Sequence, residues 1–136
     1  SEKNLNTVLK VKTNMDSGMF YGVQKGAIAA LETDNSWLEN QNNIYKKRRL
    51  LTMELAMSLH LQPQVQSGGL FVWCKLPDGG KDDKAFVDHL LYEHHIFIAP
   101  GSVFGSNGTG YVRFSLCVKE ELIKEMIERL SKKVEA

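Results

Sequence analysis

Apolar residues recur at helical spacing in the first part of the chain. Leu5, Val8 and Leu9 form one stripe of a helix expected over residues 2–12, and turn-forming residues over 13–18 interrupt it. A second apolar run predicts a helix over 20–31, whose glycines and alanines would let another backbone approach closely. The N-terminal region is therefore expected to form two helices separated by a turn.

A long helix is predicted next. Asp-Asn-Ser at 34–36 supplies a capping residue, and the apolar period continues to about His60. Such a helix would be about 35 Å long, more than a small domain needs for its own core, so we expect it to bridge to another part of the protein. The residues at helical spacing are Trp37, Ile44, Arg48, Leu51, Leu55 and Leu59.

Strand patterns begin after Pro63. Residues 64–66 alternate, and residues 70–76 form a nearly continuous apolar run that is typical of a buried strand. A short extended segment is expected over 95–99, and a last strand over 111–117. Together these segments predict a small sheet.

Two further helices complete the pattern. One should begin at Asp82 or Asp83 and turn apolar residues inward, and the helix expected over 119–134 is strongly amphipathic. The inward residues are Phe86, Val87, Leu90 and Leu91 in the first helix, and Leu122, Ile123, Met126, Ile127, Leu130 and Val134 in the second. The predicted fold class is α/β or α+β, a small sheet covered by helices.

The composition fits one ordinary globular domain. The chain has 136 residues, of which 43% are hydrophobic and 24% charged, with a formal net charge of +1. The one dense basic cluster covers residues 46–49, and we expect it to be solvated or to face a partner. This charge pattern argues against nucleic acid as a partner.

The two cysteines indicate a compartment. Cys74 and Cys117 lie in apolar, strand-like runs, so we expect two buried thiols in a reducing, cytoplasmic setting. The sequence has no run of eighteen apolar residues, so we expect no membrane attachment. It opens at Ser1 and enters helical sequence at once, as an excised piece of a longer protein would, although processing would leave the same start.

Arg113 is the strongest candidate for a binding residue in this sequence. Side chains alternate along a strand, so Val112, Phe114 and Leu116 share one face and Arg113 points to the other. A guanidinium fixed on a strand beside a glycine-rich loop suits recognition of a carboxylate or a phosphate. An ordinary solvent-facing strand arginine is the alternative that the arginine alone would favour.

Other candidates have simpler explanations. The histidines at 94–95 lack further ligands at metal-binding spacing, and the glycines over 105–110 do not match a phosphate loop. The acidic pairs at 82–83 and 120–121 lie at expected helix starts, where they favour the helix dipole. We therefore expect no metal site and no catalytic residue in this chain.

Four segments in order resemble the C-terminal third of fold-type I, class I/II aminotransferases, which use pyridoxal phosphate. They read VKTNMDSGMFYGVQKGAIAALE from Val11, IYKKRRLLTMELAMSL from Ile44, SGGLFVWCKLP from Ser67 and HIFIAPGSVFGSNGTGYVRFSL from His95. The last segment is the most specific, with its P-G-x-x-F-G and a strand carrying arginine. The sequence of these segments is similar to the aspartate, alanine or LL-diaminopimelate aminotransferase branch of the family.

The resemblance implies a fold and a set of roles. The sheet of the family's small domain is mostly antiparallel, so residues 34–136 would be a linker helix and C-terminal small domain, and residues 1–33 the end of the large domain. Arg113 would bind the α-carboxylate of an amino acid or 2-oxo acid. Asn14, Ser17 and Gly18 would lie near the active site of the neighbouring subunit in a homodimer.

The resemblance also implies what this chain lacks. The family's cofactor lysine and phosphate ligands belong to an upstream region, and Lys3, Lys10 and Lys12 do not lie in the matching motif. The chain alone is therefore expected to be inactive, with pyridoxal phosphate held by the full-length parent. A non-catalytic anion-binding module and a structural interaction domain remain the alternatives, and the amino donor stays open.

Overall fold

The computed structural model describes residues 2–16, 18–64 and 68–132. The chain divides into two compact units, Ser1–Glu39 and Asn40–Ala136. Each unit is described below by itself.

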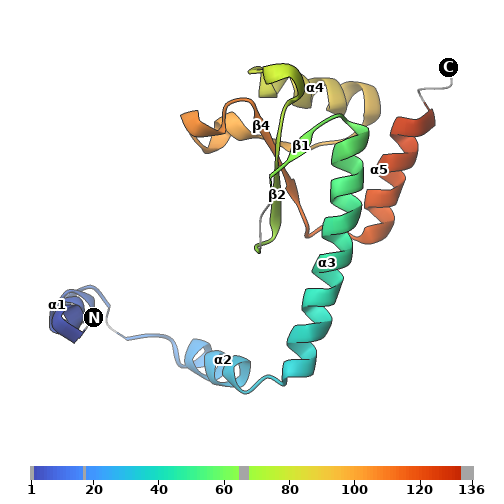
Figure 1. Cartoon of the computed structure of the whole chain (residues 1–136). Coiled ribbons are helices and arrows are strands. Elements are labelled where there is room, and N and C mark those ends of the chain that lie inside the picture. Colours follow the sequence, from blue (N-terminus) through green and yellow to red (C-terminus); the bar gives the residue numbers. More distant parts are fainter. Residues whose placement is uncertain (1, 17, 65–67, 133–136) are drawn as a thin grey trace. The chain divides into compact units, whose positions relative to one another are not determined.

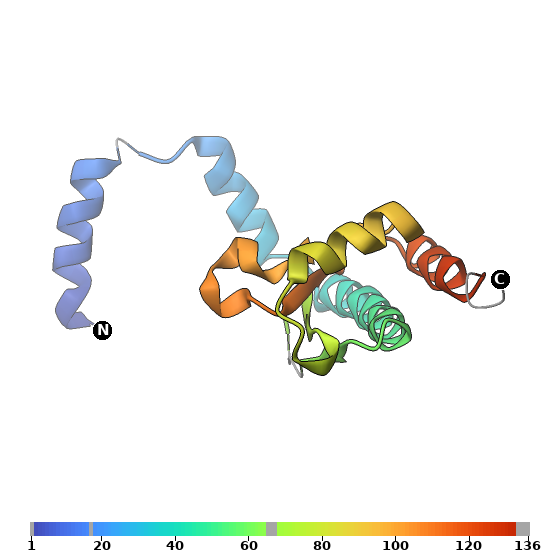
Figure 2. The ribbon, with the colours of Figure 1, turned by 90° about the horizontal axis from the view of Figure 1, so that it is seen from above.

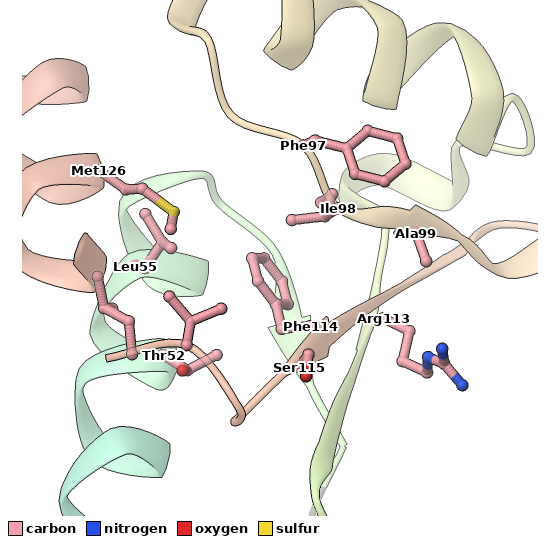
Figure 3. A pocket seen from close by; sticks show the side chains of 11 residues that line it. Thr52, Leu55, Phe97, Ile98, Ala99, Arg113, Phe114, Ser115 and Met126 are labelled. Carbon is pink, nitrogen blue, oxygen red and sulfur yellow. The ribbon is translucent and has the colours of Figure 1, made fainter. Parts of the chain in front are cut away.

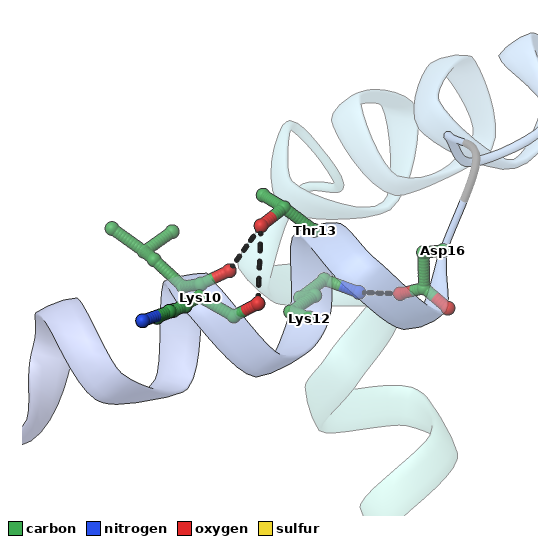
Figure 4. A network of polar contacts seen from close by, with 5 residues as sticks. Lys10, Lys12, Thr13 and Asp16 are labelled. Carbon is green, nitrogen blue, oxygen red and sulfur yellow. Dashed lines mark hydrogen bonds and ion pairs between the residues drawn. The ribbon is translucent and has the colours of Figure 1, made fainter.

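The first unit contains helices α1 (Glu2–Met15) and α2 (Tyr21–Leu31). The turn predicted from residue 13 is wrong in its first part, because α1 continues to Met15. Polar side chains stabilise this last turn of α1. The Thr13 hydroxyl donates a hydrogen bond to the Leu9 carbonyl at 2.8 Å, and Lys12 forms an ion pair with Asp16 (Figure 4). Gly18, with a φ of 113°, then takes a conformation that favours glycine.

No side chain that the structure describes in α1 or α2 is buried. The apolar stripes that predicted these helices face outward. The exposed apolar residues of the two helices are Leu5, Val8, Leu9, Val11, Met15, Tyr21, Val23, Ile28 and Leu31.

Helix α3 (Asn35–Ser58) begins at the predicted cap. Asp34 Oδ1 accepts a hydrogen bond from the Ser36 amide at 2.6 Å, which also lowers the Asp34 pKa. The helix ends two residues before the expected His60, which has a positive φ of 56°. Leu55 is buried as the spacing predicts, together with the adjacent Ala56, whereas Trp37, placed on the same stripe as Leu55, is exposed.

The second unit contains a four-stranded antiparallel sheet in the order β1 (Gln62–Pro63), β2 (Phe71–Lys75), β4 (Tyr111–Ser115), β3 (Ala99–Pro100). The central pair aligns Trp73 with Arg113 and Val72 with Phe114. Of the alternation expected over 64–66, residues 65–66 lie outside the described part. The antiparallel α+β class is confirmed.

Helices cover one face of this sheet. Figure 1 and Figure 2 show α3 and α5 (Glu120–Lys132) side by side, with α4 (Asp83–His94) across the end of the strands. The core residues are Leu55, Ala56, Leu61, Val72, Cys74, Leu76, Val87, Leu90, Ile96, Ile98, Val112, Phe114, Leu116 and Ile123. The sheet's other face carries Phe71, Trp73 and Arg113, and none of these is buried.

The ends of the last two helices are close to their predicted positions. Asp82 caps α4 by accepting from the Ala85 amide at 2.9 Å, and His95 ends it in the left-handed conformation. Leu122 was expected on the buried stripe of α5 but is exposed, because the stripe runs through Ile123. Val134 lies outside the described residues. None of the helices in the described part is long and apolar enough to cross a membrane.

Candidate functional site

Arg113 lies in the middle of the sheet, on the face that no helix covers. Strand β4 places it between Trp73 of β2 and Ala99 of β3. Its neighbours Val112 and Phe114 point into the core, as the alternation predicts. The half-buried Arg113 side chain therefore starts from a backbone that is paired on both sides.

Two phenylalanine rings sandwich the guanidinium. Arg113 Cζ lies 4.0 Å from the centroid of the Phe71 ring and 3.9 Å from that of Phe104. The Phe104 ring in turn meets the Trp73 ring edge-on, with the centroids 5.5 Å apart. Cation–π contacts therefore cover the guanidinium from two elements far apart in the sequence.

The Arg113 guanidinium has no carboxylate partner and no hydrogen-bond acceptor within the part of the chain that the structure describes. The contrast with Arg48 is clear, since Arg48 Nε donates to Glu120 Oε1 at 2.7 Å and Nη1 to the Leu116 carbonyl at 3.3 Å. A half-buried guanidinium with unused donors is suited to a planar anion that accepts two parallel hydrogen bonds.

A pair of 3₁₀ turns carries Phe104 to the guanidinium. They are η2 (Gly101–Phe104) and η3 (Ser106–Gly108). Their backbones approach closely at Gly101 and Gly108, where neither residue has a Cβ. A Cβ on Gly101 would lie 2.2 Å from the Gly108 carbonyl oxygen, and one on Gly108 would lie 2.0 Å from the Gly101 oxygen. Gly105, at a φ of 117°, connects the two turns.

A buried carboxylate fixes the start of this loop. Asp83, only 3% exposed at the N-terminus of α4, accepts a hydrogen bond from the Ser102 amide at 2.6 Å through Oδ2. The sequence predicted only a capping role for an aspartate here. Asp82 fills that role, which leaves Asp83 to hold the loop that carries Phe104.

A cavity of about 180 Å³ opens beside β4 (Figure 3). It is lined mainly by apolar residues, including Leu55, Ile98 and Met126, and Arg113 is its only charged lining residue. Figure 3 shows the guanidinium pointing away from Leu55 and Met126, so the donors lie on the other side of the sheet. The donors of Arg113 and this apolar cavity are therefore separate features.

The other predicted site residues lie in the first unit, away from Arg113 in the sequence. The Asn14 side-chain amide donates to the Lys10 carbonyl at 2.7 Å, within the last turn of α1. Gly18 follows that helix, and Ser17 lies outside the described residues. Nothing in these contacts tests the role that the resemblance gives them.

The histidines at 94–95 and the basic cluster at 46–49 were the other chemical candidates. His94 is half-buried with its ring 5.8 Å from that of His89, and the described residues contain no cluster of metal-ligating side chains. Part of the basic cluster at 46–49 is engaged rather than solvated. Beside the paired Arg48, Arg49 Nη2 donates to the Gly69 carbonyl at 2.8 Å.

The two cysteines differ, although both were expected to be buried. Cys74 is fully buried, and burial raises its pKa to about 12. Cys117 is exposed, which corrects the prediction. The reason is that β4 ends at Ser115, so Cys117 lies in the turn before α5 and no longer follows strand alternation.

The contacts do not fit a complete pyridoxal phosphate pocket in this chain. The cavity beside Arg113 has no lysine to bond the cofactor aldehyde and no carboxylate for the ring nitrogen. Lys12 lines a cavity on α1 together with Asp16, but its ammonium is paired with that aspartate. Among the described residues, the linings of these two cavities therefore do not fit the aldehyde and the ring nitrogen of that cofactor.

The sequence pattern pointed to Arg113 but not to the clamp around it, the two rings of Phe71 and Phe104. Phe71 and Phe104 are 33 residues apart in the sequence, and neither belongs to a motif for anion binding. Phe71 offered one local signal, because it shares a strand face with Trp73 two residues later. Phe104 offered two signals, the dense set of glycines around it and its place as the phenylalanine of the P-G-x-x-F-G motif, but neither indicated a contact with Arg113.

Known proteins are similar to this chain in both sequence and fold. The family model for aminotransferase class I and II matches residues 2–130. The LL-diaminopimelate aminotransferases of Syntrophobacter fumaroxidans and Maridesulfovibrio salexigens are 40% and 37% identical to this chain, over 90% of its length and 31% of theirs.

A structure of substrate-bound BacF from Bacillus subtilis superimposes with a TM-score of 0.81 at 33% identity, covering 97% of this chain and 34% of that one. The chain thus spans about a third of the length of the relatives it matches, in their C-terminal part. It belongs to the class I and II aminotransferase family.

Proposed function

We propose that the chain is the C-terminal part of an amino acid aminotransferase and that Arg113 binds the α-carboxylate of the amino acid or 2-oxo acid. The observation that supports this role is a half-buried guanidinium, stacked between Phe71 and Phe104, whose donors have no partner among the described residues. The family match supports a transaminase as the parent protein.

Arg113 would act by binding and orienting the substrate. Its planar fork can donate two parallel hydrogen bonds to a carboxylate, and this bidentate contact fixes the direction of the bonds at the substrate's Cα. A guanidinium held by stacking and by a strand paired on both sides loses little freedom when the substrate binds. The chain's own contribution is therefore position, not proton transfer.

The parent protein would complete the site. Pyridoxal phosphate and its lysine would be supplied by residues outside this chain, so the isolated chain is expected to be inactive. We assign residues 1–33 to the end of the large domain and residues 34–136 to the linker helix and small domain. The enzyme would be a cytoplasmic homodimer, with Asn14, Ser17 and Gly18 near the partner subunit's site.

The experiment replaces Arg113 in the full-length protein. Arg113→Gln should lower kcat/KM for the best donor among L-aspartate, L-alanine, L-phenylalanine and LL-diaminopimelate by about 100-fold, because a charge-assisted bidentate contact is lost. Arg129→Gln is the matched control, since Arg129 pairs with Glu125 on α5 and donates to the carbonyl of His95, the residue that caps the end of α4. Wild-type kinetics in Arg113→Gln would remove Arg113 from the substrate site.

The isolated chain gives a second test. Mixed with pyridoxal phosphate and borohydride, it should show no stoichiometric labelling of one lysine. Such labelling, followed by transaminase activity, would show that the cofactor site lies within this chain.

A further inference from the structure

The two rings around Arg113 do more than fill space. A guanidinium has two flat faces and an edge that carries its N–H donors. The ring centroids of Phe71 and Phe104 lie 4.0 and 3.9 Å from Arg113 Cζ. Phe71 belongs to β2 and Phe104 to η2. Rings at these distances occupy space over the guanidinium plane, which favours approach of an anion along the edge that carries the N–H donors.

We infer that Phe71 and Phe104 are positioning residues that hold the Arg113 guanidinium for in-plane, bidentate binding of the substrate carboxylate. This inference rests on the proposed function of Arg113. Free arginine side chains sample many rotamers, and ordering one on binding costs affinity. The clamp removes part of that cost before the substrate arrives.

Phe104 is the adjustable half of the clamp. Phe71 belongs to the central strand β2, whereas Phe104 is 48% exposed and ends a 3₁₀ turn. Its place depends on two contacts made elsewhere: the Gly101–Gly108 backbone approach and the hydrogen bond from the Ser102 amide to buried Asp83. The glycine-rich loop therefore serves the arginine indirectly, by delivering a ring rather than by binding phosphate.

A double-mutant cycle in the full-length enzyme tests the clamp. The variants are Phe104→Leu, Arg113→Gln and the double variant, assayed with the best donor of the panel above. Phe104→Leu should raise KM about fivefold with kcat changed less than twofold, because one cation–π contact is lost. Phe104→Tyr, which keeps an aromatic face, should restore the wild-type KM.

The cycle separates this inference from the proposed function. If Phe104 acts through Arg113, Phe104→Leu should have no further effect in the Arg113→Gln background. An equal effect in both backgrounds would overturn the clamp while leaving Arg113 as the carboxylate ligand. No effect of Arg113→Gln alone would overturn the proposed function, and the clamp with it.

Two controls guard against a loss of folding. Tyr92→Leu removes an exposed ring from α4 of the same unit and should leave KM unchanged. Phe71→Leu removes the other ring and should reproduce the KM effect at an unchanged thermal midpoint. A wild-type KM in both Phe71→Leu and Phe104→Leu would contradict the inference.

Discussion

Residues 1–39 and residues 40–136 both form amphipathic helices, but the described side chains are buried only in the second unit. In that unit three helices and a sheet share one core, and Arg113 is attached to it through β4. In the first unit the apolar stripes of α1 and α2 contain no buried side chain.

The difference shows that a helical pattern and a packed core are separate outcomes of a sequence. Spacing at three and four residues selects a helix and one apolar face, whereas burial needs a second surface of matching shape. The chain supplies that surface for α4 and α5, whose inward residues meet β2 and β4. Mutations should therefore have large effects in the second unit and small effects in the first.

A matched pair of leucines gives the largest expected difference. Leu90→Ala removes a side chain that is 2% exposed and should lower the free energy of unfolding by about 3 kcal/mol. Leu9→Ala, at a position 48% exposed on α1, should change it by less than about 0.5 kcal/mol. Urea denaturation followed by circular dichroism measures both, and a similar cost for the two variants would contradict the contrast between the units.

A pair of glycines tests the same contrast at the backbone. Gly101→Ala places a Cβ 2.2 Å from the Gly108 oxygen and 2.7 Å from that of Tyr111, so it should destabilise the second unit by about 2 kcal/mol. Gly26→Ala meets no atom within 4 Å in α2 and should stabilise that helix by up to about 1 kcal/mol. Thermal unfolding should show shifts of opposite sign, and equal shifts would refute the tight approach of the two turns.

The sequence predicted most of the elements but not the contacts between them. The long helix, the central strands and α4 follow from periodicity and caps, because those signals are local. Val112, Phe114 and Leu116 are buried as strand alternation requires. Cys117 was misplaced because β4 ends at Ser115 and the chain turns at residues 116–117, where the Cys117 amide donates to the Ser115 hydroxyl at 3.2 Å.

The candidate site shows the same limit. Alternation was enough to turn Arg113 away from the core, since it needs only the strand. The position of Phe104 beside the guanidinium involves the close approach of η2 and η3 and the hydrogen bond from the Ser102 amide to Asp83. These contacts join residues far apart in the sequence, and no spacing rule encodes them.

The buried thiol of the second unit should make stability depend on alkaline pH. Burial raises the pKa of Cys74 to about 12 from 9.0, so the folded state keeps its proton where the unfolded state loses it. Stability should therefore fall as the pH rises from about 9 toward 12, and Cys74→Ala should flatten this part of the profile relative to wild type. The exposed Cys117 should react with a thiol reagent at pH 8 while Cys74 reacts only on unfolding, and rapid labelling of both would show an open core.

Two ion pairs give the smallest expected difference between the units. The Arg48–Glu120 pair joins α3 to α5 at 2.7 Å, with side chains only 18% and 31% exposed, and Arg48 also bonds the Leu116 carbonyl. The Lys12–Asp16 pair lies along one helix with side chains 60% and 52% exposed, where water and salt screen it.

Glu120→Gln should therefore cost about 1 kcal/mol of unfolding free energy, and Asp16→Asn about 0.3 kcal/mol or less. The matched acid-to-amide changes keep side-chain size nearly constant, so the comparison isolates the charge. In 0.5 M NaCl the effect of Asp16→Asn should vanish while most of the Glu120→Gln effect remains, because the partly buried pair is less accessible to ions. Equal salt sensitivity of the two variants would mean that Arg48 and Glu120 are as solvated as a surface pair, and that α3 and α5 are held together by apolar contacts alone.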